Sequence, residues 1–175
     1  PATTTPLSCL ELILLLRQAG LAEEWCQTFI TEDNALAEQL ATDERVAFLS
    51  FIGSAKVGWY LRSKLAPGTR CALEHGGAAP VIVDRSANLT QTTQALTKGG
   101  YYHAGQVCVS VQRIFVHKGI ISKFMDEFVE RVKSLRVGDP LLKETEVGPL
   151  ILPRETERVV SWIDEAVAKG AKLFG

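Results

Sequence analysis

The chain lacks the features that mark several classes of protein. Its 175 residues carry a formal net charge of −1, with 22% charged residues and no block of like charges, so no surface for nucleic acid or anionic lipid is predicted. No apolar run approaches the roughly 20 residues that a membrane-spanning helix needs. The first residues have neither the basic start nor the apolar stretch of a signal peptide. We therefore expect a cytoplasmic protein that has no nucleic-acid partner and no membrane partner.

Clustered metal ligands are also missing. The chain has three histidines and four cysteines, with no C-x-x-C pair and no group of histidines. Because Cys9, Cys26, Cys71 and Cys108 stand far apart, neither a zinc site nor a disulfide framework is predicted. A free cysteine usually packs as a small hydrophobe, so each thiol has a purely structural interpretation beside any chemical one. We expect four reduced thiols and no metal.

The residues that are present favour an α/β fold. Apolar residues make up 46% of the chain, which is enough for a core. Short apolar runs alternate with stretches at helical spacing, a pattern typical of mainly parallel sheets flanked by helices. The run at 46–51 is almost wholly apolar and predicts a strand covered on both faces. Predicted strands cover 25–30, 46–51, 71–74, 81–83 and 112–116, with another starting at 172–174; predicted helices cover 7–18, 34–42, 88–98, 121–135 and 153–167, and a further helix follows Ser54.

The strand-to-helix junction at Phe51 to Ser54 is the first candidate site. A turn of this kind leaves backbone N–H groups and the positive end of a helix dipole free, which suits a phosphate or pyrophosphate. Gly53 and Gly58 are five residues apart, so the spacing is not the G-x-G-x-x-G of ordinary dinucleotide folds. The alternative is an ordinary turn in which Ser54 only caps the helix.

Two further segments carry reactive side chains. Glu74 follows an apolar strand, where a carboxylate is costly to keep charged and is suited to act as a base; the alternative is a strand-end glutamate that faces solvent. Cys108 follows Gly105 and Gln106 in a short loop between a predicted helix and a predicted strand, a place where catalytic side chains are often presented. A thiolate is a strong nucleophile, so Cys108 is a candidate for covalent catalysis.

Taken in order, these segments resemble the aldehyde dehydrogenase superfamily along the whole chain. The motifs are Phe-x-Gly-Ser at 51–54, Glu-x-Gly-Gly at 74–77 and Gly-Gln-x-Cys at 105–108, followed by Val-Gly-Asp-Pro at 137–140 and Val-Gly-Pro-Leu at 147–150. The candidate base and nucleophile lie 34 positions apart, as they do in that family. The opening segment is similar to the one that follows the cofactor-binding lysine of the family.

The resemblance implies roles for single residues. The cysteine that matches Cys108 attacks an aldehyde carbonyl, and the residue that matches Glu74 deprotonates the water that hydrolyses the resulting thioester. The cofactor is NAD or NADP, and the substrate is a small-molecule aldehyde. Thr3 stands where NAD-preferring members usually carry a glutamate, so NADP use is a hypothesis. The residues matched to cofactor binding are Phe51, Gly53, Ser54, Gly58 and Thr3.

The same resemblance divides the chain and marks its departures from the family. Residues 1–74 match the second half of the NAD(P)-binding domain, and residues 75–175 match the first half of the catalytic domain. Family members are several hundred residues long, so we expect this chain alone to have little or no activity and the full-length protein to form a homo-oligomer. Ile52 and His75 replace a usual threonine and a usual leucine. His75 could perturb Glu74, although a histidine near a hinge is more often structural.

Two other functions fit the same residues. A non-catalytic homologue could keep the fold as an interaction or structural subunit, although the presence of both Cys108 and Glu74 favours an enzyme. An acylating enzyme could pass the thioester to coenzyme A, which would make the hydrolytic base Glu74 unnecessary. Which aldehyde is oxidised does not follow from these residues.

Overall fold

The computed structural model describes all 175 residues and divides them into two compact units. Unit 1 is Pro1–His75 and unit 2 is Gly76–Gly175. Both units contain helices and a pair of parallel strands, which confirms the predicted α/β class with parallel sheets. No helix has the length and apolar character needed to cross a membrane.

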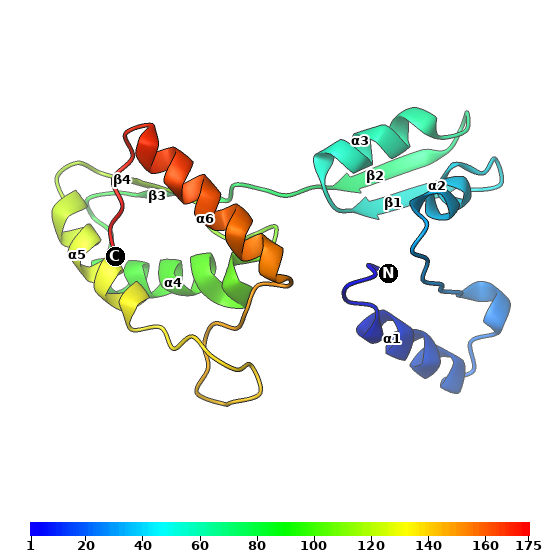
Figure 1. The fold of residues 1–175 in the computed structure, drawn as a ribbon, viewed down its shortest axis with the longest axis horizontal. Coiled ribbons are helices and arrows are strands. Elements are labelled where there is room, and N and C mark those ends of the chain that lie inside the picture. The colour runs from blue at the N-terminus through cyan, green and yellow to red at the C-terminus, as the bar shows by residue number, and fades with distance from the viewer. The chain divides into compact units, whose positions relative to one another are not determined.

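Unit 1 is built around the parallel pair of β1 (Phe48–Ile52) and β2 (Arg70–Glu74), with α3 (Ala55–Lys64) as the connection between them (Figure 1). A strand–helix–strand crossover of this kind is the usual way to join neighbouring parallel strands. Asp33 begins α2 (Asn34–Thr42) by accepting a hydrogen bond from the Ala35 N–H at 2.8 Å. The remaining elements are α1 (Leu7–Gln18) and a 3₁₀ turn, η1 (Glu23–Trp25).

Unit 2 contains a second parallel pair, β3 (Pro80–Val83) with β4 (Arg113–Val116). Between these strands the chain forms α4 (Leu89–Tyr101) and the 3₁₀ segment η2 (Tyr102–Gly105), and after them α5 (Ile121–Lys133) packs against α4 (Figure 1). Asn88 caps α4 by accepting from the Gln91 N–H at 3.1 Å. The last element is α6 (Pro153–Ala168), which has proline at its first turn.

The core of unit 2 lies between its strands and helices. Val83, Leu96 and Phe124 are 2%, 5% and 2% exposed, and they come from β3, α4 and α5 respectively. Phe124 stacks on Phe128 with ring centroids 5.4 Å apart, as the helical spacing of apolar residues at 121–135 predicts. This cluster holds α4, the helix before the loop of Cys108, against α5.

Three expectations about strands were wrong. Residues 25–30 form the end of η1 and irregular chain, and residues 172–174 are also irregular. A segment without a hydrogen-bonded neighbour does not become a strand. The third error concerns burial. Phe48 and Ile52 of β1 are 52% and 80% exposed, so the strand predicted to be covered on both faces is not covered within these residues.

Candidate functional site

The first two motifs of the sequence meet at one edge of the β1–β2 pair. Ile52 is in register with Glu74, so both strands end at the same level. The N–H of Gly53 donates to the carbonyl of Glu74 at 3.0 Å, which ties the turn to the end of β2. Ligands of parallel sheets bind outside the carboxyl ends of the strands, and this is the edge where Glu74 and the turn lie.

The turn itself opens directly into α3. The Ser54 side chain accepts from the Val57 N–H at 3.3 Å and caps the helix. The other N–H groups of the first turn have no acceptor within the helix, and the exposed Lys56 adds a positive charge beside them. The N-terminus of α3 therefore has the donors and the charge that a pyrophosphate requires.

Two glycines near this turn lie close to neighbouring rings of unit 1. A Cβ on Gly53 would lie 2.7 Å from the Phe51 ring, and a Cβ on the buried Gly58 would lie 2.5 Å from Nε2 of His75. Both distances are shorter than real Cβ contacts, so a larger residue at either position would displace an aromatic or imidazole ring. The glycines singled out from the sequence thus lie in close contact with side chains of unit 1, whether or not a cofactor is bound.

His75 is packed instead of projecting into solvent. Its Nε2 is buried and has no hydrogen-bond partner, and its ring centroid lies 5.9 Å from the Trp59 ring at an angle of 60°. The imidazole covers the groove that Gly58 leaves in α3. This packing gives His75 a structural role, and it also fixes the backbone immediately after Glu74.

Glu74 differs from its expectation in one respect. Its side chain is exposed at the end of β2, so the burial that the apolar strand suggested is not found. The strand residues before it, Cys71 to Leu73, are half-buried, and Glu74 at the end of the strand is exposed. The carboxylate is therefore accessible to water, and the solvent-facing alternative describes it in these 175 residues.

Cys108 is the exposed thiol of the four, whereas Cys9, Cys26 and Cys71 are half-buried. The nucleophile hypothesis requires an accessible sulfur, and Cys108 meets this requirement. The chain reaches Cys108 through three consecutive residues with positive φ: His103 at 50°, Ala104 at 55° and Gly105 at 74°. Non-glycine residues in this conformation cost about 1–3 kcal/mol each and persist only where the surrounding structure holds them.

Gln106 helps to stabilise this backbone conformation through hydrogen bonds. Its amide nitrogen donates to the carbonyls of His103 at 2.9 Å and Pro149 at 3.4 Å, while its amide oxygen accepts from the Ile151 N–H at 2.8 Å. The loop before Cys108 is thereby fastened to the Val-Gly-Pro-Leu segment some 40 residues later. The glutamine of the Gly-Gln-x-Cys motif acts as a clamp between two motifs that are separate in sequence.

Gly77 holds the other side of the Cys108 loop. A Cβ at this position would lie 2.8 Å from the backbone carbonyl oxygen of Cys108, so only glycine allows the two chains to approach so closely. Hydrogen bonds from the Gln112 N–H to Ala78 at 3.2 Å and from the Val111 N–H to Gly99 at 3.0 Å continue the contact. The sequence marked Gly76 and Gly77 only as part of the Glu-x-Gly-Gly motif, and it missed the contact of Gly77 with the nucleophile loop.

Thr3 lies apart from the turn at Ser54. It is exposed and lines a pocket of about 660 Å³ in unit 1, together with Cys9, Cys26 and the chain that follows η1. Glu74 belongs to unit 1 and Cys108 to unit 2, so the pairing of base and nucleophile stays a prediction. Within each unit the structure joins Gly53 to Glu74, and Gly77 to Cys108.

Comparison with known proteins agrees with these motifs. The model of the aldehyde dehydrogenase family matches residues 1–175, and the chain belongs to this family. The chain is 37% identical over 173 residues to a 3-sulfolactaldehyde dehydrogenase of Priestia megaterium, covering 99% of this chain and 36% of that protein. It is also 37% identical over 178 residues to a lactaldehyde dehydrogenase of Methanocaldococcus jannaschii, covering 99% and 38%.

Solved structures show the same fold. A glyceraldehyde-3-phosphate dehydrogenase of Methanocaldococcus jannaschii in complex with NADP superposes with a TM-score of 0.93 at 36% identity, covering all of this chain and 39% of that one. A betaine aldehyde dehydrogenase of Staphylococcus aureus in complex with NAD+ superposes with a TM-score of 0.92 at 29% identity, covering 98% and 34%. The chain thus spans little more than a third of the length of these relatives.

Proposed function

We propose that the protein containing these residues oxidises a small-molecule aldehyde to a carboxylic acid, with Cys108 as nucleophile and Glu74 as general base. The observation that carries the proposal is the exposed Cys108 on a loop held in an unfavourable backbone conformation by Gln106 and Gly77. Such strain gathers at functional sites because it fixes a reactive group in place. Family membership supports the same reaction class.

The chemistry assigned to these side chains has two steps. The Cys108 thiolate attacks the aldehyde carbon and forms a C–S bond, and the Cys108 backbone N–H stabilises the resulting oxyanion. Loss of hydride from this adduct leaves a thioester on the sulfur. Glu74 then takes a proton from water, the hydroxide attacks the thioester carbon, and the C–S bond breaks to release the carboxylic acid and the thiolate.

A nicotinamide cofactor, NAD or NADP, would supply the hydride acceptor. The residues present fit its pyrophosphate, because the first turn of α3, beside Gly53 and Gly58, offers free N–H groups and the exposed Lys56 adds a positive charge. Phe51 lies in β1 before this turn and Ser54 caps α3 after it, and Thr3 is proposed to face the adenosine ribose. Complexes of the solved relatives with NADP and with NAD+ support either cofactor.

The remaining predictions concern the whole protein. Residues 1–74 are assigned to cofactor binding and residues 75–175 to catalysis, and a cytoplasmic homo-oligomer is expected when the chain is full length. The isolated 175 residues are expected to show little or no NAD(P)H production, because they span little more than a third of the length of the relatives. Robust turnover by these residues in a spectrophotometric assay would contradict that expectation.

Thiol labelling tests the role of Cys108. An activated thiol should react with iodoacetamide faster in the folded chain than in the same chain unfolded in concentrated urea, where every cysteine has ordinary reactivity. We expect Cys108 to show this acceleration, and Cys9, Cys26 and Cys71 to be slowed by folding, as read by mass spectrometry of each peptide. If folding leaves Cys108 no faster than in urea, the non-catalytic interpretation gains and the proposal fails.

Kinetics of the full-length protein test Glu74. Glu74→Gln should abolish hydrolysis while leaving the first hydride transfer, so a single burst of NAD(P)H should replace steady turnover. Cys108→Ser should remove the burst as well. An acylating enzyme would behave differently, because coenzyme A would restore turnover in Glu74→Gln.

A further inference from the structure

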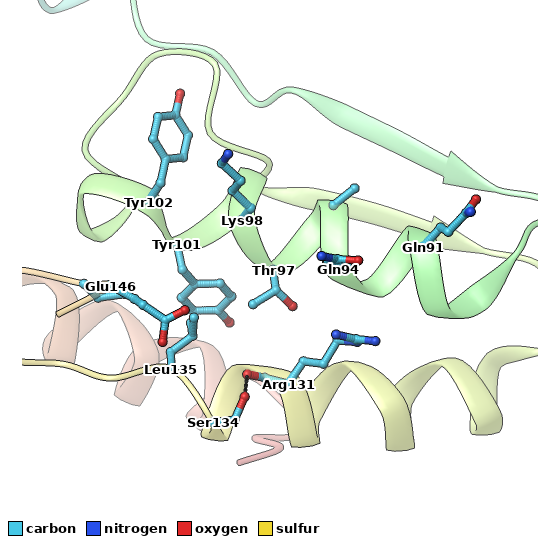
Figure 2. Close-up of a pocket in the computed structure, with 12 residues that line it drawn as sticks. Gln91, Gln94, Thr97, Lys98, Tyr101, Tyr102, Arg131, Ser134, Leu135 and Glu146 are labelled. Atoms are coloured by element: carbon cyan, nitrogen blue, oxygen red, sulfur yellow. Dashed lines mark hydrogen bonds between the residues drawn. The ribbon is translucent and has the colours of Figure 1, made fainter. Parts of the chain in front are cut away.

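A pocket in unit 2 lies outside the residues assigned to the reaction. It occupies about 680 Å³ between α4 and α5, and its walls include Gln94, Thr97, Tyr101, Arg131, Leu135 and Val147 (Figure 2). None of the residues proposed for catalysis or cofactor binding lines it. Pockets of this size, with apolar walls and a few polar groups, are typical of small-molecule sites.

Thr97 is the first sign that the pocket is a binding site. The residue is only 7% exposed, and its Oγ1 is buried without a hydrogen-bond partner. Figure 2 shows the side chain leaving α4 toward α5. A buried hydroxyl without a partner is unfavourable and uncommon in folded proteins. A ligand with a hydrogen-bonding group would satisfy the Thr97 hydroxyl.

Arg131 is the second sign. It leaves α5 toward the same gap, is half-buried, and takes part in none of the ion pairs of the structure. Glu146, the acidic residue on the pocket wall, accepts from the backbone N–H of Arg136 at 3.1 Å and lies 3.5 Å from its guanidinium. The charge of Glu146 is therefore already matched, while that of Arg131 is not.

The rest of the wall consists of apolar and neutral residues and one further cation, the exposed Lys98 of α4. The Tyr101 ring lies in the gap near Phe128, at 6.4 Å between centroids, and Leu135 and Val147 complete that side. Burial raises the pKa of Tyr101, so its hydroxyl keeps its proton at neutral pH. A ligand seated here would meet a cation and a hydroxyl at one end and hydrocarbon at the other.

We propose that the α4–α5 pocket binds a small organic carboxylate. The guanidinium of Arg131 would pair with the carboxylate, the Thr97 hydroxyl would donate to one of its oxygens, and the apolar body would rest on Tyr101 and Leu135. Arginine suits this task because its planar fork matches a carboxylate and is more weakly hydrated than an ammonium. The site does not depend on the proposed dehydrogenase reaction.

Benzoate is the test ligand, because it joins a carboxylate to a flat apolar ring. In titrations of the 175-residue chain followed by amide NMR signals, we expect saturable shifts at residues of α4 and α5 around Thr97 and Arg131. Benzamide has nearly the same shape without the charge, and should bind at least about tenfold more weakly. Inorganic phosphate has the charge without the ring, and should also bind more weakly. Equal binding of benzoate and benzamide, or no saturable binding of benzoate, overturns the proposal.

Matched variants locate the site. Arg131→Gln should weaken benzoate at least about tenfold, whereas Lys133→Gln removes the same charge from α5 outside the pocket and should leave affinity unchanged. Thr97→Val should weaken it several-fold, with Thr92→Val on the same helix as control. If Arg131→Gln loses its dispersed NMR spectrum, this variant is unfolded. The comparison of Thr97→Val with Thr92→Val then tests the site. A pocket variant that binds as tightly as its control overturns the assignment.

Discussion

The two units of this chain contain similar elements but differ in how well they are packed. Unit 2 closes a core of Val83, Leu96 and Phe124, whereas Ile13 is the one large hydrophobic residue of unit 1 with comparable burial. A parallel strand pair needs cover on both faces, and β1 does not find it within 175 residues. The chain spans only 36% of a relative such as the 3-sulfolactaldehyde dehydrogenase.

The same difference appears in the two candidate sites. The turn at Ser54 is built from neighbours in sequence and from one hydrogen bond to Glu74. The Cys108 loop is held by contacts with residues far along the chain, including Gly77 and Ile151. We therefore expect the turn to form whenever β1 pairs with β2, and the nucleophile loop to depend on the fold of unit 2.

Replacement of a core phenylalanine in unit 2 should give the largest difference in stability between the two units. Phe124→Ala should cost unit 2 about 3–5 kcal/mol, because it removes a fully buried ring and leaves a cavity. Phe48→Ala, at a ring that is 52% exposed in β1, should change the stability of unit 1 by much less. Hydrogen exchange resolved by peptide should show lost protection in β3, β4, α4 and α5 for the first variant alone.

The contrary outcome is equally informative. If Phe48→Ala deprotects unit 1 as strongly as Phe124→Ala deprotects unit 2, then β1 is covered in solution and the exposed face of unit 1 is filled by a contact between chains. Measurement at several protein concentrations would separate these cases, since only a contact between chains depends on concentration.

Local signals in the sequence predicted much of the secondary structure. The predicted bounds of α2 at 34–42 and of α1 at 7–18 agree with the structure, because Asp33 provides a cap and Gly20 follows the end of α1 with a φ of +94°. The predicted strand at 25–30 failed because an apolar stretch becomes a strand only when it finds a partner. Short range periodicity cannot report such a partner.

The candidate sites divide in the same way. The cap at Ser54 and the loop position of Cys108 follow from motifs and could be predicted. The clamp by Gln106 reaches Pro149 and Ile151, a contact between two motifs that no spacing rule connects. The sequence left Glu74 open between a buried base and a solvent-facing glutamate, because burial of a strand end depends on the elements packed beyond it.

The glycine pair at the start of unit 2 allows a test of the long-range contact that holds the Cys108 loop. Gly77→Ala would place a Cβ 2.8 Å from the carbonyl oxygen of Cys108, and backbone cannot rotate away, so we expect a loss of about 1–3 kcal/mol. Gly76→Ala meets nothing within 4 Å and should be nearly neutral. Urea unfolding of both variants measures the difference, and similar midpoints would show that Gly77 does not lie against Cys108 in solution.

A smaller effect is expected where the obstacle is a side chain. Alanine at Gly58 would gain up to about 1 kcal/mol of helix propensity, but its Cβ would lie 2.5 Å from Nε2 of His75. In a double-mutant cycle, Gly58→Ala should therefore be neutral or destabilising with His75 present, and less unfavourable in a His75→Ala background, where the Phe51 ring at 3.2 Å is the remaining close contact. A coupling of about 1 kcal/mol measures the contact. Simple additivity would mean that His75 does not cover Gly58, which would leave the backbone after Glu74 free to move.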